Sequence, residues 1–430
     1  MCLQGRHFMK NNFCTYPFEH IYLHSTGHFR VCCMMEENVT KDDGYRQYNA
    51  NRDSLTALWN SEYYKQIRKD MIANKRLDKC KKCWMAEDNG LASMRRTHNS
   101  KHFIDNTHSD GTIDLQPRDM ELHFGNVCNL SCKMCSTQFS HMIGKELLKM
   151  GDKDPDFLKW VKKESGLVNN WTSELDIVYD WYKNKKIKKE IFEVVSKHTE
   201  SLVVIGGEPT IIPEFYELLE YCYDQKTLKD KNLVVTTNLT NTNPKFTTWL
   251  KQLKDFTIHA SIDGVEERNE YIRYPSKWTA IQKSLDFYAQ MMKDQNKGKI
   301  SFNPAIQTLN IDILPEMVKY FETFDEIANY SWISHVRSPV ICDYDHAPIQ
   351  WKNKVADKIM SQLKNIKNTD NKNELEQHAL RLSKPSASDS LQNIHKSFMR
   401  YNDAQDKFRK CKTWRELMPD LEEALTESLS

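Results

Sequence analysis

Three cysteines close together in the chain, Cys128, Cys132 and Cys135, have the spacing C-x3-C-x2-C. Thiolates are the usual protein ligands of iron–sulfur clusters. Three thiolates on one loop can hold three irons of a four-iron cube and leave the fourth open, and a substrate can bind an open metal position. The triplet therefore predicts a [4Fe–4S] cluster with one iron available for chemistry.

Two other interpretations of the triplet are a zinc site and unrelated core cysteines. A structural zinc site normally has four protein ligands, so three cysteines on one loop would need a distant fourth. With 12 cysteines in 430 residues, chance would place this spacing in such a chain only about 0.01 times. The iron–sulfur interpretation is therefore preferred.

A second group of cysteines lies in the first hundred residues. Cys14 and Cys32 are followed by a C-x2-C pair, Cys80 and Cys83. Four cysteines suit either a fully ligated iron–sulfur cube or a zinc ribbon. Cys33 is adjacent to Cys32 and is an alternative ligand at that position.

The composition is that of a globular protein, with 39% hydrophobic residues, 28% charged residues and a net charge of only +2. This balance makes a nucleic-acid partner unlikely on charge grounds. No apolar run approaches the roughly 18 residues that cross a bilayer, and residues 1–7 lack the apolar region of a signal peptide. We therefore expect a cytoplasmic protein without a membrane partner, in which reduced thiols are free to bind metals.

Short apolar runs separated by helical stretches begin near residue 119. Strands are expected at 121–124, 202–205, 233–237, 257–262, 301–307 and 331–336, and the four from 202 to 307 recur every 25–45 residues or so. This rhythm favours βα units around a parallel sheet or barrel. Before it, a strand is expected at 29–34 and a helix at 55–72.

Three domains are expected. Residues 1–112 hold the first cysteine group, residues 113–340 hold the strands with a helical insertion at 140–198, and residues 341–430 are a helical segment. The acidic residues 422–430 are expected to be a frayed tail.

Polar residues follow several of the expected strands, at the end where parallel barrels place their active sites. Two glycines in Gly206-Gly207-Glu208-Pro209 allow a ligand to approach the backbone, and Glu208 can pair with an ammonium group. Each motif alone also suits an ordinary turn. The later strands are followed by Thr236-Thr237-Asn238, by Ser261-Ile262-Asp263-Gly264 with Arg273, and by Asn303, Gln307 and Asn310.

The triplet and the order of these motifs resemble the radical S-adenosylmethionine (SAM) superfamily, which has this cysteine spacing, a Gly-Gly-Glu-Pro motif, T-x-N and S-x-D-G. The resemblance implies a [4Fe–4S] cluster on Cys128, Cys132 and Cys135. The position before the last cysteine is usually aromatic, whereas here it is Met134, whose thioether can still pack against adenine. The residues that the resemblance assigns to SAM are Met134, Gly206, Gly207, Glu208, Pro209, Thr237, Asn238, Ser261, Asp263 and Arg273.

The N-terminal group resembles the SPASM and twitch domains, which hold auxiliary [4Fe–4S] clusters. The similar features are Cys14-x12-Gly27-x4-Cys32, the stretch 58–68, and the pair Cys80 and Cys83. The resemblance implies a second, auxiliary [4Fe–4S] cluster on Cys14, Cys32, Cys80 and Cys83. These domains usually follow the barrel, whereas this one precedes it.

Together these resemblances imply an α/β protein with a partial (β/α)6 radical SAM barrel. It would reductively cleave SAM to a 5′-deoxyadenosyl radical that abstracts hydrogen from a substrate, with flavodoxin or ferredoxin as the reductant. A peptide or protein is the first expected substrate, and a sugar or nucleotide-like metabolite is the alternative. A third hypothesis is that the protein is a zinc-ribbon module that binds nucleic acid through the lysine-rich run 183–189. The same run is also typical of a solvated helix face.

Overall fold

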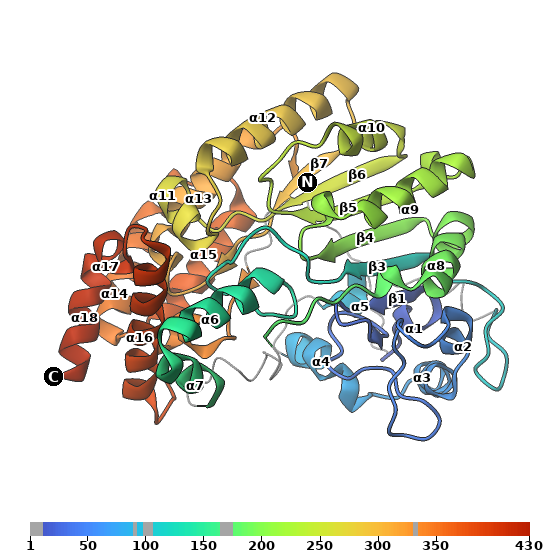
Figure 1. The fold of residues 1–430 in the computed structure, drawn as a ribbon, viewed down its shortest axis with the longest axis horizontal. Coiled ribbons are helices and arrows are strands. Elements are labelled where there is room, and N and C mark those ends of the chain that lie inside the picture. The colour runs from blue at the N-terminus through green and yellow to red at the C-terminus, as the bar shows by residue number, and fades with distance from the viewer. Residues whose placement is uncertain (1–11, 89–92, 98–105, 164–174, 330–333) are drawn as a thin grey trace. The chain divides into compact units, whose positions relative to one another are not determined.

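The computed structural model describes residues 12–88, 93–97, 106–163, 175–329 and 334–430. Residues 1–7, part of the expected insertion (164–174) and the start of the expected strand at 331–336 lie outside the described residues. The chain has a mixed α/β fold with mainly parallel strands (Figure 1), which confirms the expected class. None of the described helices has the length and apolarity that a membrane span requires.

Ten strands are present in the described part of the chain. Eight of them are hydrogen-bonded in the order β2-β1-β3-β4-β5-β6-β7-β9, and β8 pairs separately with β10. Their bounds are β1 His20–Leu23, β2 Phe29–Arg30, β3 Asp119–Phe124, β4 Ser201–Gly206, β5 Asn232–Thr237, β6 Asp255–Ala260, β7 Lys299–Phe302, β8 Ala305–Ile306, β9 Ala328–Asn329 and β10 Ser334–His335.

Helices follow most of the strands and form the last part of the chain. They are α1 Tyr16–Glu19, α2 Leu55–Trp59, α3 Glu62–Ile72, α4 Lys81–Asp88, α5 Met94–Thr97, α6 His141–Lys153, α7 Pro155–Lys163, α8 Lys185–His198, α9 Pro213–Asp224, α10 Pro244–Gln252, α11 Glu266–Ile272, α12 Trp278–Gln295, α13 Leu314–Phe321, α14 Ile349–Gln362, α15 Thr369–Leu382, α16 Leu391–Arg409, α17 Trp414–Leu417 and α18 Pro419–Leu429.

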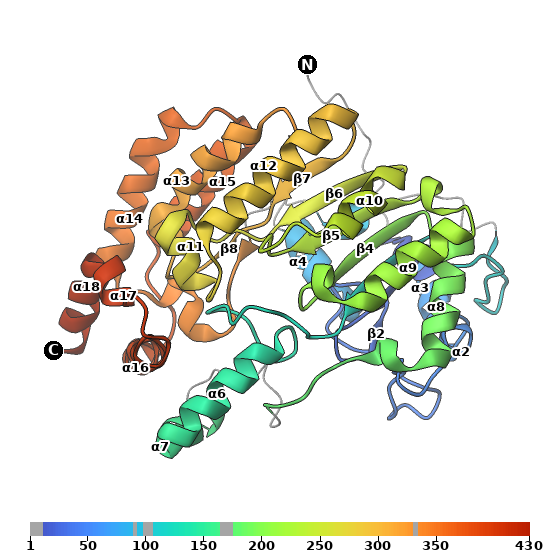
Figure 2. The ribbon, with the colours of Figure 1, turned by 45° about the horizontal axis from the view of Figure 1, so that its top comes forward.

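The chain divides into two compact units. Unit 1 comprises residues 1–125, 180–204 and 217–233, and unit 2 comprises 126–179, 205–216 and 234–430. The N-terminal cysteines belong to unit 1, whereas the 128–135 loop and all the strand-end motifs belong to unit 2. In unit 2 the helices α14 to α18, orange to red in Figure 2, follow the last strand.

In unit 1, β1 pairs in parallel with β3, with Tyr22 opposite Glu121 and Leu23 opposite Leu122. The apolar residues on alternate positions, such as Leu23 and Leu122, are fully buried. In unit 2, β6, β7 and β9 are parallel, and Phe302 on β7 stacks on Phe321 of α13 with ring centroids 4.3 Å apart. Parallel strands end at the same edge of the sheet, and that edge carries the polar motifs.

The expected strands at 121–124, 202–205 and 233–237 coincide with β3, β4 and β5, and the expected strand at 257–262 overlaps β6, which ends at Ala260. The expected strand at 301–307 is interrupted after Phe302, because Pro304 has no N–H to donate to a ladder. The expected strand at 29–34 ends at Arg30, where the chain turns toward Cys32.

The expected helix at 55–72 is wrong as one element, because it breaks at Asn60 between α2 and α3. The fully buried Arg68 donates hydrogen bonds to the Asn60 side chain and the Trp59 carbonyl, both at 2.8 Å. Asn60 also bonds the backbone of Ile113. These tertiary contacts hold the interruption, and helical periodicity alone could not reveal it.

Candidate functional site

The loop that carries the cysteine triplet follows β3 and is mostly buried. Cys128 is 8% exposed and Cys132 is 7% exposed. Cys135 and Met134 are partly buried and pack against these two cysteines and Leu130. Met134 therefore lies beside the thiols.

Hydrogen bonds fix the shape of this loop from within. The Leu130 N–H donates to Cys128 Sγ at 3.4 Å, and the Ser140 hydroxyl donates to the Leu130 carbonyl at 2.6 Å. The buried Asn126 side chain donates to the carbonyls of Thr137 and Ile177. Because N–H groups aimed at sulfur stabilise a thiolate, the Leu130 N–H lowers the pKa of Cys128 and so favours its ligating form in part.

Burial nevertheless keeps the three thiols protonated. It raises the pKa of Cys128 to about 12, and it also raises the pKa of Cys132 and of Cys135. The Arg273 guanidinium opposes this effect at all three thiols. Buried thiols that must ionise need a strong positive partner, and a metal cluster supplies one. The donor set therefore fits the iron–sulfur cluster expected here.

The Gly206-Gly207-Glu208-Pro209 turn packs directly on the cysteine loop. A Cβ atom at Gly207 would lie 1.9 Å from the Val127 carbonyl oxygen, and the Glu208 N–H donates to that oxygen at 2.8 Å. Gly206 has φ +138°, which favours glycine. Pro209 starts a short 3-10 turn, Pro209–Ile211. The close approach at Gly207 thus joins two parts of the protein, a use of glycine that the motif alone did not indicate.

The Glu208 carboxylate is 1% exposed and connects the ends of β4 and β5. It accepts hydrogen bonds from the Thr210 and Thr237 hydroxyls at 2.6 and 2.8 Å, and from the Asn238 N–H at 2.7 Å. Burial raises its pKa against these hydrogen bonds. Three of the expected SAM residues, Glu208, Thr237 and Asn238, therefore form one buried network.

The same network reaches the cysteine loop through Asn129, which lies directly after Cys128. The Asn238 amide donates to Asn129 Oδ1 at 2.8 Å, and the Asn129 amide donates to the Thr240 hydroxyl at 2.8 Å. Asn129 was not among the residues expected from the sequence. Its position inside the cysteine motif was the available signal.

Asp263 and Arg273 form a buried ion pair, with Nε and Oδ2 2.7 Å apart. Asp263 also accepts the Ala305 N–H at 2.7 Å, and the Ser261 N–H donates to the Thr237 carbonyl at 3.0 Å. These contacts connect the ends of β5, β6 and β8. Arg273 serves two partners at once, the Asp263 carboxylate and the cysteine thiols.

The polar residues after β7 have different surroundings. Asn310 donates to the Asp263 carbonyl at 2.8 Å and so belongs to this site. Gln307 is fully buried, and the structure gives its side-chain amide no hydrogen-bond partner. Asn303 Oδ1 accepts a hydrogen bond from the Ser301 hydroxyl at 3.1 Å.

The N-terminal cysteines gather in unit 1 from three segments. Cys14 precedes α1, Cys32 follows β2, and Cys80 and Cys83 flank the start of α4. Gly27, with φ +84°, forms the turn between β1 and β2.

The thiols of this group interact electrostatically. Burial, reinforced by neighbouring cysteines, raises the pKa of Cys32 to about 11 and of Cys80 to about 12, and raises that of Cys14 well above its ordinary value. The negative charges of Cys32, Cys80 and Cys83 all raise the pKa of Cys14. For Cys33, the largest effect of a charged group on the pKa comes from Glu121. Four cysteines suit a closed cluster.

The chain matches two protein families. Residues 14–84 match SPASM, an iron–sulfur cluster-binding domain, and residues 122–321 match the radical SAM superfamily. No curated protein matches significantly.

Two of the similar solved structures are of Streptococcus suis SuiB. The structure bound to S-adenosylmethionine is 14% identical over 58% of this chain and 45% of SuiB, and the other is 11% identical over 80% and 68%, respectively. Both TM-scores are 0.33. The chain spans less than half of the first of these structures.

Proposed function

The chain belongs to the radical SAM superfamily and carries a SPASM domain ahead of its radical SAM domain, and from this premise we propose that it modifies a peptide or protein by hydrogen abstraction. The observation that supports the radical chemistry is the joining of the cysteine loop to the GGEP, T-x-N and S-x-D-G motifs within one unit. The peptide or protein substrate is proposed from the SPASM match, because enzymes with such domains often modify peptides. A one-electron donor such as flavodoxin or ferredoxin would supply the reducing equivalent.

We assign the two cofactor sites as follows. Cys128, Cys132 and Cys135 would hold the cluster that binds SAM, and Cys14, Cys32, Cys80 and Cys83 would hold the auxiliary cluster. When bound, the first cluster supplies the electron that splits SAM into methionine and a 5′-deoxyadenosyl radical. We also retain the domain limits 1–112, 113–340 and 341–430 as a proposal.

The chain's own residues would bind and orient the cosubstrate. Met134 packs against the cysteines, and the Gly206–Pro209 turn packs on the backbone of Val127 in the same loop, so both would meet SAM where it approaches the open iron. Arg273 and Asp263 would keep a fixed charge pattern beside it, and the burial of Glu208 and Asp263 would keep water out.

The nucleic-acid hypothesis has less support. The lysine-rich run 183–189 lies at the start of α8, where the Asn184 side chain caps the helix and Ile187 is buried. Lys188 pairs with Glu217 at 2.7 Å. Alternating buried and exposed residues are typical of a solvated helix face.

Anaerobic reconstitution tests the proposal. With dithionite and SAM, the protein should form 5′-deoxyadenosine and methionine, and adding a peptide substrate should increase the rate. Absence of 5′-deoxyadenosine from protein that carries its full iron would contradict the radical chemistry. Stimulation by sugar or nucleotide derivatives instead of peptides would contradict the substrate class alone.

A further inference from the structure

Helix α16 contacts the cysteine loop on both sides of Cys132. Arg409 Nη2 donates to the Ser131 carbonyl at 2.6 Å, and Lys133 Nζ lies 3.0 Å from Asp406 Oδ1. Ser131 and Lys133 are the neighbours of Cys132 in the chain. The helix lies outside residues 122–321, the span that matches the radical SAM family.

The chain at the end of α11 holds the same two loop residues by their backbone. The Ser131 N–H donates to the Tyr274 carbonyl at 2.7 Å, and the Lys133 N–H donates to the Ile272 carbonyl at 2.8 Å. The Tyr271 hydroxyl then donates to Asp406 at 3.0 Å. Hydrogen bonds therefore enclose Cys132 in a closed circuit formed by the loop, the end of α11 and α16.

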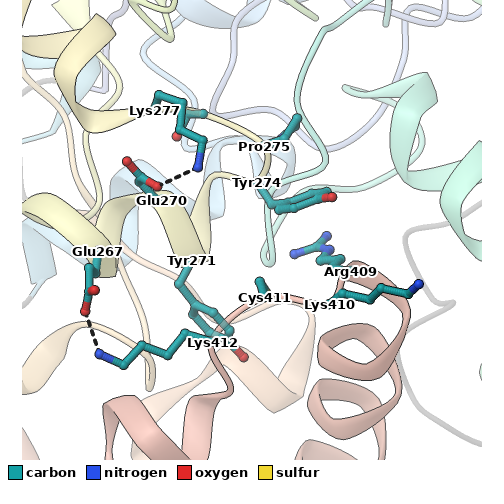
Figure 3. A pocket seen from close by; sticks show the side chains of 11 residues that line it. Glu267, Glu270, Tyr271, Tyr274, Pro275, Lys277, Arg409, Lys410, Cys411 and Lys412 are labelled. Atoms are coloured by element: carbon teal, nitrogen blue, oxygen red, sulfur yellow. Dashed lines mark hydrogen bonds and ion pairs between the residues drawn. The ribbon is translucent and has the colours of Figure 1, made fainter.

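Part of this circuit forms the wall of a surface cavity of about 440 Å³. Figure 3 shows the Arg409 guanidinium beside the Tyr274 ring, with Tyr271 and Cys411 on the same wall. The guanidinium carbon lies 4.7 Å from the centroid of the Tyr274 ring. The aromatic face and the Ser131 carbonyl thus hold the guanidinium in one orientation.

The ionised groups of this circuit are buried and paired. The side chains of Lys133 and Asp406 are 1% and 2% exposed, and those of Arg409 and Glu146 are 0% and 7% exposed. Arg409 also donates to Glu146 at 2.8 Å. Well-packed apolar residues of similar volume often stabilise a fold as well as buried ion pairs do, so stability alone does not account for two pairs at this place.

We propose that α16 is a component of the radical cluster site, in which Arg409 and Asp406 are positioning residues that hold Cys132, and the positive charge of Arg409 stabilises the reduced cluster. The inference rests on the proposed function. It is supported by the two contacts that flank Cys132, from Arg409 to the Ser131 carbonyl and from Asp406 to Lys133. Nearby charge and hydrogen bonding are established determinants of the reduction potential of a cluster.

The experiment compares Arg409→Gln with Arg409→Lys and with Arg400→Gln. Arg400 is on the same helix but packs on the Trp160 ring, at 4.5 Å from its centroid, so its replacement removes the same charge without the contact to Ser131. Redox titration monitored by EPR gives the midpoint potential of the loop cluster and its response to SAM. In Arg409→Gln the potential should fall and the SAM-induced change should weaken, Arg409→Lys should restore most of both, and Arg400→Gln should match the wild type.

The double variant Glu146→Gln with Arg409→Gln removes both charges and keeps groups of similar shape. It should fold, and because Arg409 contacts the loop directly whereas Glu146 is bonded to Arg409, its potential should still fall, but by less than in Arg409→Gln. Asp406→Ala should lose about four of about eight irons, those of the loop, while the auxiliary cluster remains.

Three results would overturn the inference. The first is an unchanged potential and SAM response in folded Arg409→Gln and in the double variant. The second is a fall in potential in Arg400→Gln equal to that in Arg409→Gln. The third is the loss of both clusters together with the helical circular dichroism signal in every variant. The third would show that the contacts hold the fold and not the loop. If the wild type itself shows no SAM-responsive cluster, the proposed function fails instead.

Discussion

The two cysteine groups use the same ligand chemistry in different surroundings. The loop of unit 2 supplies three thiols within eight residues, and Arg273, Glu208 and Asp263 lie among its immediate partners. The group of unit 1 collects four thiols from three segments, and for Cys14 the main influences are burial and the other cysteines. The loop of unit 2 has three thiols for the four irons of a cube, and polar residues lie beside them. The group of unit 1 has four thiols, one for each iron. We infer that the first binds a cosubstrate and that the second is closed.

The largest expected effect comes from removing the loop ligands. Replacing Cys128, Cys132 and Cys135 together by Ala should abolish 5′-deoxyadenosine formation. These three thiolates are the proposed ligands of the cluster, and among the described residues no other group of three cysteines lies on one loop. Iron should fall from about eight to about four per chain, and the protein should remain brown. Iron analysis and chromatography of the nucleoside measure both results, and persistent product would rule out this assignment.

Removing ligands of the unit 1 group should remove the auxiliary cluster and leave the loop cluster in place. The Cys80→Ala and Cys83→Ala double variant should also lose about four irons, but its remaining cluster should still change its EPR spectrum when SAM is added. Because thiolate ligation stabilises small domains, solubility must be checked first. Wild-type protein with four irons and one zinc would instead establish a zinc ribbon in unit 1.

A smaller effect is expected at the network that connects the strand ends. Glu208→Gln places an amide N–H against the Asn238 N–H, which disrupts a charge-assisted contact of about 1.5–3 kcal/mol. SAM affinity should fall about tenfold, without loss of iron, as measured by equilibrium binding to the reconstituted protein. Glu220→Gln, an exposed change on α9, is the matched control. Unaltered affinity would mean that the Glu208 network is structural only.

The smallest effect concerns pH. The pKa of Cys128 rises from its ordinary 9.0 to about 12 in the folded state. A group with a raised folded pKa contributes stability that is complete below the unfolded pKa and is lost as pH increases toward the folded value. The metal-free protein should therefore lose stability above pH 9 or so, and the triple alanine variant should lose less. Denaturant unfolding at two pH values measures this difference, and equal losses would contradict it.

The features that could be predicted from the sequence are those that depend on residues close together in the chain. Strands β3 to β6 were recognisable as apolar runs, and the parallel α/β class followed from their spacing. The short strand β1 was missed, because its four residues, His20–Leu23, are too few to show a periodic pattern. Likewise, the expected frayed tail at 422–430 is wrong, since α18 extends to Leu429 and buries Leu421, Ala424 and Leu425.

Long-range partners could not be predicted in this way. Gly207 lies against the Val127 carbonyl, some 80 residues earlier in the chain, and the motif alone did not indicate this contact. Lys133 is inside the cysteine motif, yet its partner Asp406 is 273 residues away. Nothing in the local pattern indicates such pairs, because each residue alone would suit an exposed helix or loop.

The separation between Lys133 and Asp406 in the chain also determines when, during translation, the two residues can first make contact. At about 5–20 residues per second, a ribosome needs on the order of 15–55 seconds to translate the intervening 273 residues. During that time the nascent cysteine loop lacks two of its supporting side chains, so a cluster could not yet be held as in the finished protein. If α16 holds the loop as proposed, the loop cluster should be inserted only after residue 409 has been translated, and a chain that ends before that residue should lack the SAM-responsive cluster.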